Sequence, residues 1–485
     1  MDIVGRIDAW SSTRPNSVAH VSGARQMTYA ELAERSDAVA AYLSRRVPDD
    51  RSPIAVVGQK ESEMVTGFLG CIKAGHPYVP LDNSLPRQRI DDIVSVAGVS
   101  AMLTPEVIRE AERERGPAGH IRPLSAADPF YIIFTSGSTG TPKGVPITLE
   151  CLTDFLEWME DEQQFRDTEV FLNQVPYSFD VSIMDTYLGL ITGGTVFSID
   201  REQITNPIKL YQALASSGVT IWVSTPTFVQ VCLVERRFDQ TMLPGVDRFF
   251  LAGEALAPSL VAQLHERFPN STVWNMYGPT EATVVVTSVR IDREMVRRYA
   301  SLPIGFPKPR TRIEIFDADG RPVANGERGE IVIAGPNVSP GYLNRPEATE
   351  RAFFRHEGLR AYRTGDAGHY EDGMVFFDGR LDSQVKLHGF RIELGDVETH
   401  LRALSRVQEA VVLPVTREGR VEALQAFVIL TGAREGSDFE IANALRAQLA
   451  ERLPAHMLPR KFRFLDTFPM TANGKVDRQN LAGLA

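Results

Sequence analysis

One segment of the sequence carries the residue types that bind a polyphosphate. Residues 130–134 read FYIIF, and Thr135 then begins a run of hydroxyl residues and glycines. Glycine lets backbone N–H groups approach an anion closely, Ser and Thr hydroxyls donate hydrogen bonds, and a lysine supplies a point charge. We therefore predict a phosphate-binding loop formed by Thr135, Ser136, Gly137, Ser138, Thr139, Gly140 and Lys143.

This loop differs from a Walker A motif, which reads GxxxxGK[ST] and opens a helix. Gly144 follows Lys143, and Pro142 together with the run VPIT indicates a loop that leads into a strand. A flexible surface loop is the alternative interpretation. Phosphate binding alone is not a reaction. Other residues of the sequence must therefore show whether the loop binds phosphate or is a flexible surface loop.

The segment NMYGPTE, at 275–281, offers further groups that suit a nucleotide. Tyr277 provides an aromatic face for a base, and Thr280 and Glu281 provide a hydroxyl and a carboxylate. A carboxylate near a polyphosphate is useful through Mg²⁺, which takes one or two carboxylates plus phosphate oxygens.

Three later motifs add a carboxylate and two cations. Asp366 in YRTGD could accept hydrogen bonds from a ribose diol, and Arg380 in GRLD could reach the same ribose or a phosphate. Lys475 follows an Asn-Gly pair near the C-terminus. Each motif taken alone is more often a turn, so their joint occurrence in this order carries the interpretation.

Together these motifs resemble the adenylate-forming enzymes, the superfamily of acyl-CoA synthetases, luciferases and nonribosomal peptide adenylation domains. The resemblance spans nearly the whole chain and rests on TSGSTGTPKG, NMYGPTE, YRTGD, GRLDSQVKLHGFRIELGDVE and NGKVDR. It implies ATP and Mg²⁺, with the metal near Glu281, and catalytic roles for Lys475, Glu281 and Thr280. Besides the phosphate loop, it implies ATP-binding roles for Asn275, Met276, Tyr277, Gly278, Pro279, Thr280, Asp366, Phe377, Arg380 and Lys475.

The segment PYSFDVSIMD, at 176–185, indicates which carboxylate is activated. Asp180 lies where amino-acid-activating members of the superfamily place the aspartate that pairs with the substrate ammonium, and a carboxylate among apolar residues needs such a cation. The alternative is an Asp that caps the next helix. By motif position the amino-acid pocket comprises Asp180, Met184, Val223, Phe250, Ala252, Met276, Val284 and Lys475.

The segments 68–86 and 171–185 are similar to the D-alanine–carrier protein ligases, which load alanine for teichoic acid. Bulky pocket residues favour a small side chain such as that of alanine. Ala252 stands where those ligases carry a cysteine, which favours L-alanine and a resemblance to the alanine-activating enzymes of actinomycete macrolactam biosynthesis.

We find no LGxxS-type attachment site, so we expect the acceptor to be a separate phosphopantetheinylated acyl carrier protein, in macrolactam biosynthesis one that already carries an aminoacyl group. Because carrier proteins are usually acidic, a basic C-terminal segment is the candidate docking patch. It contains Arg452, Arg460, Lys461 and Arg463.

Composition excludes several other classes of protein. A net charge of −10, from 52 basic and 62 acidic residues, disfavours nucleic acid as a partner. The longest apolar runs are far shorter than the roughly 18 residues that a membrane span needs, which predicts no membrane insertion. Three separated cysteines and no visible secretory signal predict a cytoplasmic protein.

The pattern of apolar runs predicts an α/β fold with a largely parallel sheet. Capped by Thr28, a helix is expected over 28–46, followed by helices over 61–74 and 207–217. Strands are expected at 54–58, 78–82, 131–135, 170–174, 195–199 and 220–224.

From about residue 301, short runs between Gly, Pro and Asp turns predict a small β-subdomain, so that layered α/β subdomains and this β-subdomain together form a large N-terminal domain over 1–381. A small α+β C-terminal domain over 382–485 is expected to follow. The resemblance implies that this domain is mobile about a hinge at Asp382 and carries the catalytic lysine.

The sequence also allows two other functions. One is an acyl- or aryl-CoA ligase of the same superfamily, against which Asp180 argues. The other is a non-catalytic nucleotide-binding protein, against which the joint presence of Lys475, Glu281 and Asp366 argues.

Overall fold

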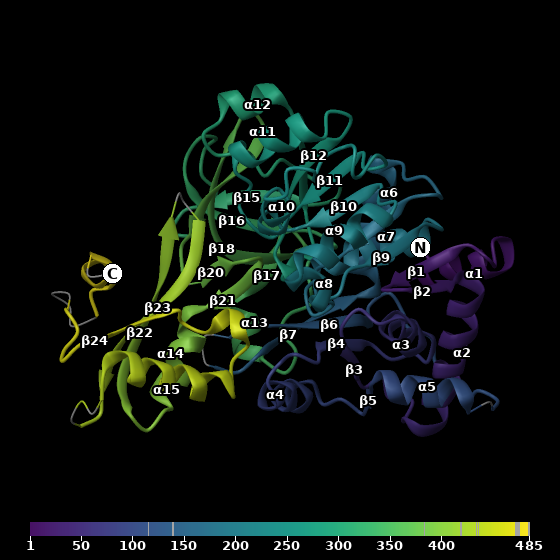
Figure 1. The fold of residues 1–485 in the computed structure, drawn as a ribbon, viewed down its shortest axis with the longest axis horizontal. Coiled ribbons are helices and arrows are strands. Elements are labelled where there is room, and N and C mark those ends of the chain that lie inside the picture. The colour runs from purple at the N-terminus through teal and green to yellow at the C-terminus, as the bar shows by residue number, and fades with distance from the viewer. Residues whose placement is uncertain are drawn as a thin grey trace. The chain divides into compact units, whose positions relative to one another are not determined.

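The computed structural model describes residues 1–114, 116–137, 140–382, 384–417, 420–432, 434, 436–470 and 476–483. The predicted site residues Ser138, Thr139 and Lys475 lie outside them. The chain forms two compact units (Figure 1). The first comprises Met1–Asn83, Ala97–Ile133 and Gly144–Leu381, and the second comprises Ser84–Val96, Phe134–Lys143 and Asp382–Ala485.

The larger sheet of the first unit has nine strands in the order β14-β13-β12-β11-β10-β8-β9-β1-β2. Strands β12, β11, β10, β8, β9 and β1 run parallel, and β13, β14 and β2 add antiparallel edges. The bounds are β1 Val18–Ser22, β2 Arg25–Thr28, β8 Val170–Asn173, β9 Thr195–Ser198, β10 Ile221–Ser224, β11 Arg248–Leu251, β12 Thr272–Tyr277, β13 Thr287–Ile291 and β14 Phe306–Pro307.

A second sheet has five strands in the order β5-β3-β4-β6-β7. Its strands are β3 Ile54–Gly58, β4 Tyr78–Asp82, β5 Ala101–Leu103, β6 Pro129–Thr135 and β7 Lys143–Thr148. The predicted α/β fold with largely parallel strands is confirmed and the predicted strands exist, but the sequence did not predict that they form two separate sheets. A twisted open sheet rarely exceeds about ten strands, and here the parallel strands divide between two sheets whose side chains share one core.

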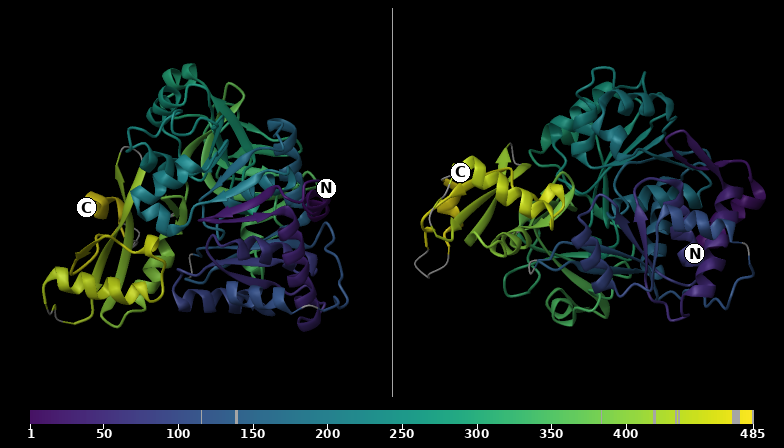
Figure 2. Two further views of the ribbon diagram at one scale, coloured as in Figure 1. Left: turned by 45° about the vertical axis from the view of Figure 1, so that its right-hand side comes forward. Right: turned by 60° about the horizontal axis from the view of Figure 1, so that its bottom comes forward.

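The helices of the first unit cover these sheets (Figures 1 and 2). Helix α2 begins as predicted, because Thr28 and Glu31 form a capping box. Every residue of α7 is buried, including its polar residues Ser182, Asp185 and Thr186. The bounds are α1 Ile3–Thr13, α2 Tyr29–Arg46, α3 Ser62–Lys73, α5 Pro105–Arg113, α6 Leu149–Gln163, α7 Val181–Ile191, α8 Arg201–Thr205, α9 Pro207–Ser216, α10 Pro226–Cys232, α11 Pro258–Arg267, α12 Arg293–Arg298 and α13 Pro346–Ala352. Helix α4, Arg87–Ala97, belongs to the second unit apart from its last residue.

A smaller antiparallel sheet forms the predicted β-subdomain of the first unit. It contains β15 Arg312–Phe316, β16 Gly329–Ala334, β17 Phe353–His356, β18 Leu359–Glu371 and β19 Met374–Arg380. One face of its strands packs in a separate apolar cluster that also includes Tyr277 of β12. This sheet therefore meets the nine-stranded sheet at the end of β12.

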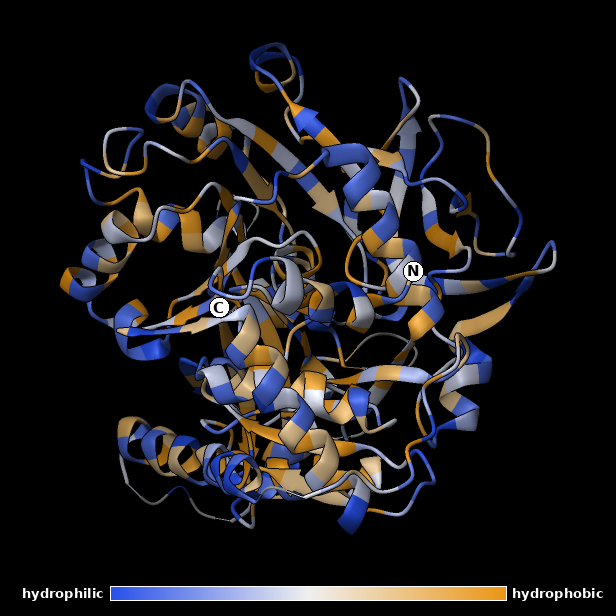
Figure 3. Cartoon of the chain, turned by 90° about the vertical axis from the view of Figure 1, so that its right-hand side faces the viewer, coloured by the Kyte–Doolittle hydropathy of each residue, from blue (hydrophilic) through white to orange (hydrophobic). Residues whose placement is uncertain are grey.

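The second unit is an α+β unit with its own apolar core. A hairpin, β20 Gln384–Leu387 and β21 Phe390–Glu393, precedes α14 Leu394–Arg402. Helix α14 is followed by β22 Val407–Arg417, β23 Arg420–Leu430 and α15 Asp438–Ala450, and then by β24 Lys461–Phe464 and α16 Arg478–Gly483. In Figure 3, apolar residues follow the inner strands and helices of the protein. Within the described residues, no helix is long and apolar enough to cross a membrane.

Candidate functional site

Three of the predicted nucleotide residues form one buried cluster around the Asp366 carboxylate. The Tyr277 hydroxyl donates to Asp366 Oδ2 over 2.6 Å, and the Arg380 guanidinium pairs with Oδ1. Asp366 and Arg380 lie opposite each other on β18 and β19. Asp366 is 2% exposed, and the tyrosine donor and the guanidinium supply the hydrogen bond and the opposite charge that a buried carboxylate needs.

Two aromatic rings stand beside this carboxylate. The ring centroids of Tyr277 and Phe377 lie 6.4 Å apart. Burial raises the pKa of Tyr277 well above its ordinary value, so its hydroxyl keeps the proton that it donates to Asp366. Asn275 lies two residues before Tyr277 on β12. Its side-chain amide donates a hydrogen bond of 2.7 Å to the backbone carbonyl of Pro303.

The turn after β12 is both tight and strained. A Cβ at Gly278 would lie 2.5 Å from the Val285 Cα, so only glycine fits there. After a 3₁₀ turn, η1 Thr280–Ala282, Thr283 and Val284 have φ of 66° and 63°. Left-handed backbone is rare for β-branched residues and gathers at functional sites. The strained turn includes the predicted pocket residue Val284.

Glu281 is fully buried within this turn. Its Oε1 accepts a hydrogen bond of 2.7 Å from the Tyr342 hydroxyl, and its backbone carbonyl accepts one of 2.9 Å from Ser339. Among the described residues, no group of three or more His, Cys, Asp or Glu could hold a metal ion. Mg²⁺ bound to a nucleotide needs only one or two carboxylates beside phosphate oxygens, and Glu281 fits that requirement.

The predicted amino-acid pocket residues gather on neighbouring strands and one helix. Val223 of β10 pairs with Phe250 of β11, whose neighbour Leu251 pairs with Asn275 of β12. The six apolar members are at most 2% exposed and belong to one core cluster. They are Met184, Val223, Phe250, Ala252, Met276 and Val284.

Asp180 immediately precedes α7 at 9% exposure. Although it occupies the N-cap position, its side chain accepts no capping hydrogen bond from the first turn of α7, all of which the structure describes. The alternative of an ordinary helix cap was therefore wrong.

The sequence did not single out two tyrosines of this region. Burial and the nearby Asp180 carboxylate raise the pKa of Tyr131, on β6, well above its ordinary value. Tyr342, in the segment between β16 and α13, holds Glu281. Tyr131 reads as one apolar residue within FYIIF, and Tyr342 lies in no recognised motif.

The predicted phosphate loop lies between β6 and β7 and belongs largely to the second unit. The Ser136 hydroxyl donates to the Arg391 carbonyl over 2.9 Å and accepts from the Glu393 N–H over 3.0 Å. Lys143 Nζ lies 3.3 Å from a Glu393 carboxylate oxygen. Strand β7 begins at Lys143, which confirms that the loop leads into a strand.

Two glycines of this loop are required by its shape. Gly140 has φ of +80°, and its N–H donates to the Gly137 carbonyl over 2.9 Å. A Cβ at Gly137 would lie 2.2 Å from the Thr141 carbonyl oxygen. These contacts hold the described residues Gly137 and Gly140 close together, and both positions require glycine.

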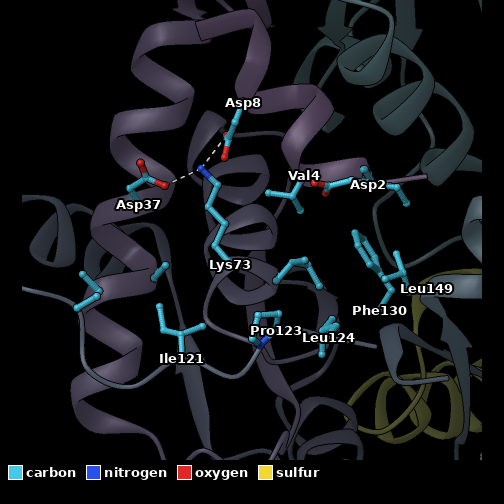
Figure 4. Close-up of a pocket in the computed structure, with 15 residues that line it drawn as sticks. Asp2, Val4, Asp8, Asp37, Lys73, Ile121, Pro123, Leu124, Phe130 and Leu149 are labelled. Atoms are coloured by element: carbon cyan, nitrogen blue, oxygen red, sulfur yellow. Dashed lines mark hydrogen bonds and ion pairs between the residues drawn. The ribbon is translucent and has the colours of Figure 1, made fainter. Parts of the chain in front are cut away.

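A cavity of about 470 Å³ lies elsewhere in the first unit, beside α1, α2 and α3 (Figure 4). Lys73 crosses it to pair with Asp8 and Asp37 at 2.8 and 2.7 Å. Among the predicted site residues that the structure describes, none lines this cavity. It is therefore separate from the predicted site.

Comparison with known proteins identifies the family. Residues 7–343 match the family model of the AMP-binding enzymes, and residues 396–475 match the model of the AMP-binding enzyme C-terminal domain. The chain therefore belongs to the AMP-binding enzyme family and is an AMP-forming ligase that uses ATP. This membership replaces the alternative of a non-catalytic nucleotide-binding protein.

Individual relatives and solved structures are similar to this chain over nearly its whole length. A Bacillus cereus protein named D-alanine--D-alanyl carrier protein ligase is 42% identical over 498 residues, which cover 99% of each chain. The Vibrio cholerae adenylation domain AlmE, solved with glycyl-adenosine-5'-phosphate, matches with a TM-score of 0.85 at 21% identity over 99% of this chain and 98% of that one. A nonribosomal peptide synthetase protein with adenylation and PCP domains matches at 25% identity with a TM-score of 0.84, over 99% and 84%.

Proposed function

We propose that this enzyme activates alanine as alanyl-AMP and transfers it to the phosphopantetheine thiol of a separate acyl carrier protein. The observation that carries this proposal is Asp180, a buried carboxylate that leaves the adjacent helix uncapped beside a pocket of apolar side chains. A carboxylate at the edge of an apolar pocket has the charge that complements a substrate ammonium. The 42% identical relative named for D-alanine and a carrier protein supports the same reaction.

In the first half-reaction, a carboxylate oxygen of alanine attacks the α-phosphorus of ATP, and the bond to the β-phosphate breaks to release pyrophosphate. Asp180 pairs with the ammonium, and the Asp366 cluster binds the ribose. Mg²⁺ beside Glu281 neutralises phosphate charge when bound. Lys475 is a positioned cation that stabilises the charge on the transferring phosphoryl group.

In the second half-reaction, the carrier thiol attacks the alanyl carbonyl carbon, and AMP leaves. Rotation of residues 382–485 about Asp382 would withdraw Lys475 between the two half-reactions. The proposed acceptor in macrolactam biosynthesis is a carrier protein that already holds an aminoacyl group.

The enantiomer of alanine is a separate question. Ala252, 1% exposed, follows β11 in the pocket and replaces the cysteine of the D-alanine–carrier protein ligases. Loss of that bulk favours L-alanine, whereas the name of the 42% identical relative favours D-alanine and a role in teichoic acid D-alanylation. ATP–pyrophosphate exchange with both enantiomers of alanine, serine and glycine tests this proposal. Activation of fatty or aryl acids instead would support the CoA ligase alternative.

The substitution Ala252→Cys should move the preference toward D-alanine. One added side-chain group in a close-packed pocket changes discrimination by about 1–3 kcal/mol, so we expect about a tenfold or larger shift in the D/L ratio of kcat/KM. Exchange assays on both enantiomers measure that ratio. Ala257→Cys, at the residue before α11, is the matched control, and an unchanged ratio in Ala252→Cys would reject Ala252 as the residue that reads chirality.

Charge reversal of the docking patch should weaken transfer to the carrier protein. Arg452, Arg460, Lys461 and Arg463 are all exposed in the second unit. We expect Arg460→Glu/Lys461→Glu to lower kcat/KM for the carrier protein about tenfold or more, with the loss shrinking at high salt and with exchange activity unchanged. Arg201→Glu/Arg236→Glu, a pair of exposed residues in the first unit, is the control. Equal transfer rates in the two double variants would contradict the patch.

A further inference from the structure

A buried lysine anchors the connection that leads to Asp180. Lys60 is 4% exposed, and its Nζ donates to Asn173 Oδ1 over 2.6 Å and to the Val175 carbonyl over 2.5 Å. The same ammonium lies 4.0 Å from the centroid of the Tyr177 ring. Three contacts therefore fix the chain at residues 173, 175 and 177.

The Asn173 side chain connects Lys60 to α7 through hydrogen bonds. Its Nδ2 donates to Asp185 Oδ1 over 2.6 Å, while its Oδ1 accepts from Lys60 and, over 2.8 Å, from Ser198. The amide is thus oriented with its oxygen toward a cation and its nitrogen toward a carboxylate. Burial lowers the pKa of Lys60 and raises that of Asp185, each to about 7, and attraction between the two groups opposes both shifts.

A neutral histidine completes the network. His20 is fully buried, which lowers its pKa to about 3, and its ring nitrogens contact Ser198 over 2.9 Å and Ser62 over 3.0 Å. Ser198 donates its proton to Asn173, so it accepts from His20 Nε2, and Nδ1 then accepts from Ser62. Every orientation in the network follows from the hydrogen bond that Lys60 donates to the Asn173 oxygen.

This network joins the two sheets at the ends of parallel strands. Lys60 follows β3 of the five-stranded sheet, and Asn173 ends β8 of the nine-stranded sheet. In α/β folds, ligands bind at the carboxyl ends of such strands. Asn173 also pairs in register with the pocket residue Val223, and Asp185 adjoins the pocket residue Met184.

We propose that Lys60 is a positioning residue for the amino-acid site, holding residues 173–180 so that Asp180 meets the substrate ammonium. This proposal rests on the proposed function of Asp180. A buried charge is a poor device for stability, because apolar residues of similar volume often replace buried ion pairs without loss. The three contacts of Lys60 instead suit a role in holding the loop at residues 173–177 in one conformation.

The test compares Lys60→Met with Lys73→Met. Lys73 is a matched control, because its side chain is only 8% exposed in the first unit and pairs with two aspartates, yet it lies at the separate cavity (Figure 4). We expect Lys60→Met to raise KM for the amino acid about tenfold to hundredfold, since small misplacements have effects of this size. KM for ATP should change less than about twofold, and Lys60→Arg should recover part of the loss.

Hydrogen–deuterium exchange separates this proposal from the proposed function. Lys60→Met should speed amide exchange in 174–180 relative to the wild type, and Lys73→Met should not. Faster exchange with no amino-acid activation by the wild-type enzyme would reject the proposed function and keep the positioning role. Two results would overturn the positioning role of Lys60. One is a folded Lys60→Met enzyme with unchanged KM for the amino acid and unchanged amide exchange, and the other is an equal change in KM for the amino acid and for ATP.

Discussion

Asp180→Asn will lower kcat/KM for the amino acid by about 10²- to 10³-fold, while the enzyme still binds ATP. Leaving a buried charge without its partner costs about 3–5 kcal/mol, and each 1.4 kcal/mol corresponds to about a factor of ten. Asparagine keeps the size of the side chain but cannot neutralise the substrate ammonium. ATP–pyrophosphate exchange with alanine measures the loss, and binding of a fluorescent ATP analogue checks the nucleotide site.

A matched substitution separates this effect from a general loss of stability. Asp154 of α6 is also buried in the first unit, where it pairs with Lys308 and Arg310. Asp154→Asn should lower the melting temperature without changing KM for alanine. If Asp180→Asn activated alanine as well as the wild type, Asp180 would not bind the ammonium, and another group would have to hold it.

The sequence predicted local structure well because local chemistry determines it. The capping box at Thr28 and Glu31 sets the start of α2, and short β-branched runs mark β3, β4, β8, β9 and β10. The division into two sheets was missed, since strand order and pairing depend on contacts between distant segments. No spacing within the chain reports that β6 pairs with β4 while β8 pairs with β10.

The same limit applies to the site. Motifs predicted Tyr277, Asp366 and Arg380 as nucleotide residues, and the structure brings the three together. The motifs did not predict that the tyrosine hydroxyl holds the aspartate. Lys60 shows the limit more clearly, because a lysine within GQKES reads as an exposed turn residue. Its burial depends on Asn173 and Val175, more than a hundred residues along the chain.

Lys475→Ala will stop the first half-reaction and spare the second. Removing one preorganised donor from a developing negative charge lowers kcat by about 10²- to 10³-fold, and a full positive charge facing the α-phosphate should matter at least as much. Transfer from preformed alanyl-AMP to the carrier protein needs no such cation if residues 382–485 rotate after the adenylate forms. Single-turnover assays started from ATP and alanine, or from alanyl-AMP and carrier protein, measure the two steps separately.

The pattern of losses decides between two roles for this lysine. Arg417→Ala, an exposed change on β22 of the same unit, is the control and should leave both steps unchanged. A loss confined to adenylation supports a cation that serves one half-reaction and then withdraws about Asp382. Equal losses in both steps would mean that Lys475 stays at the reacting atoms throughout, which contradicts the proposed rotation. Full adenylation activity would remove Lys475 from the mechanism and leave Mg²⁺ and the phosphate loop to stabilise the charge.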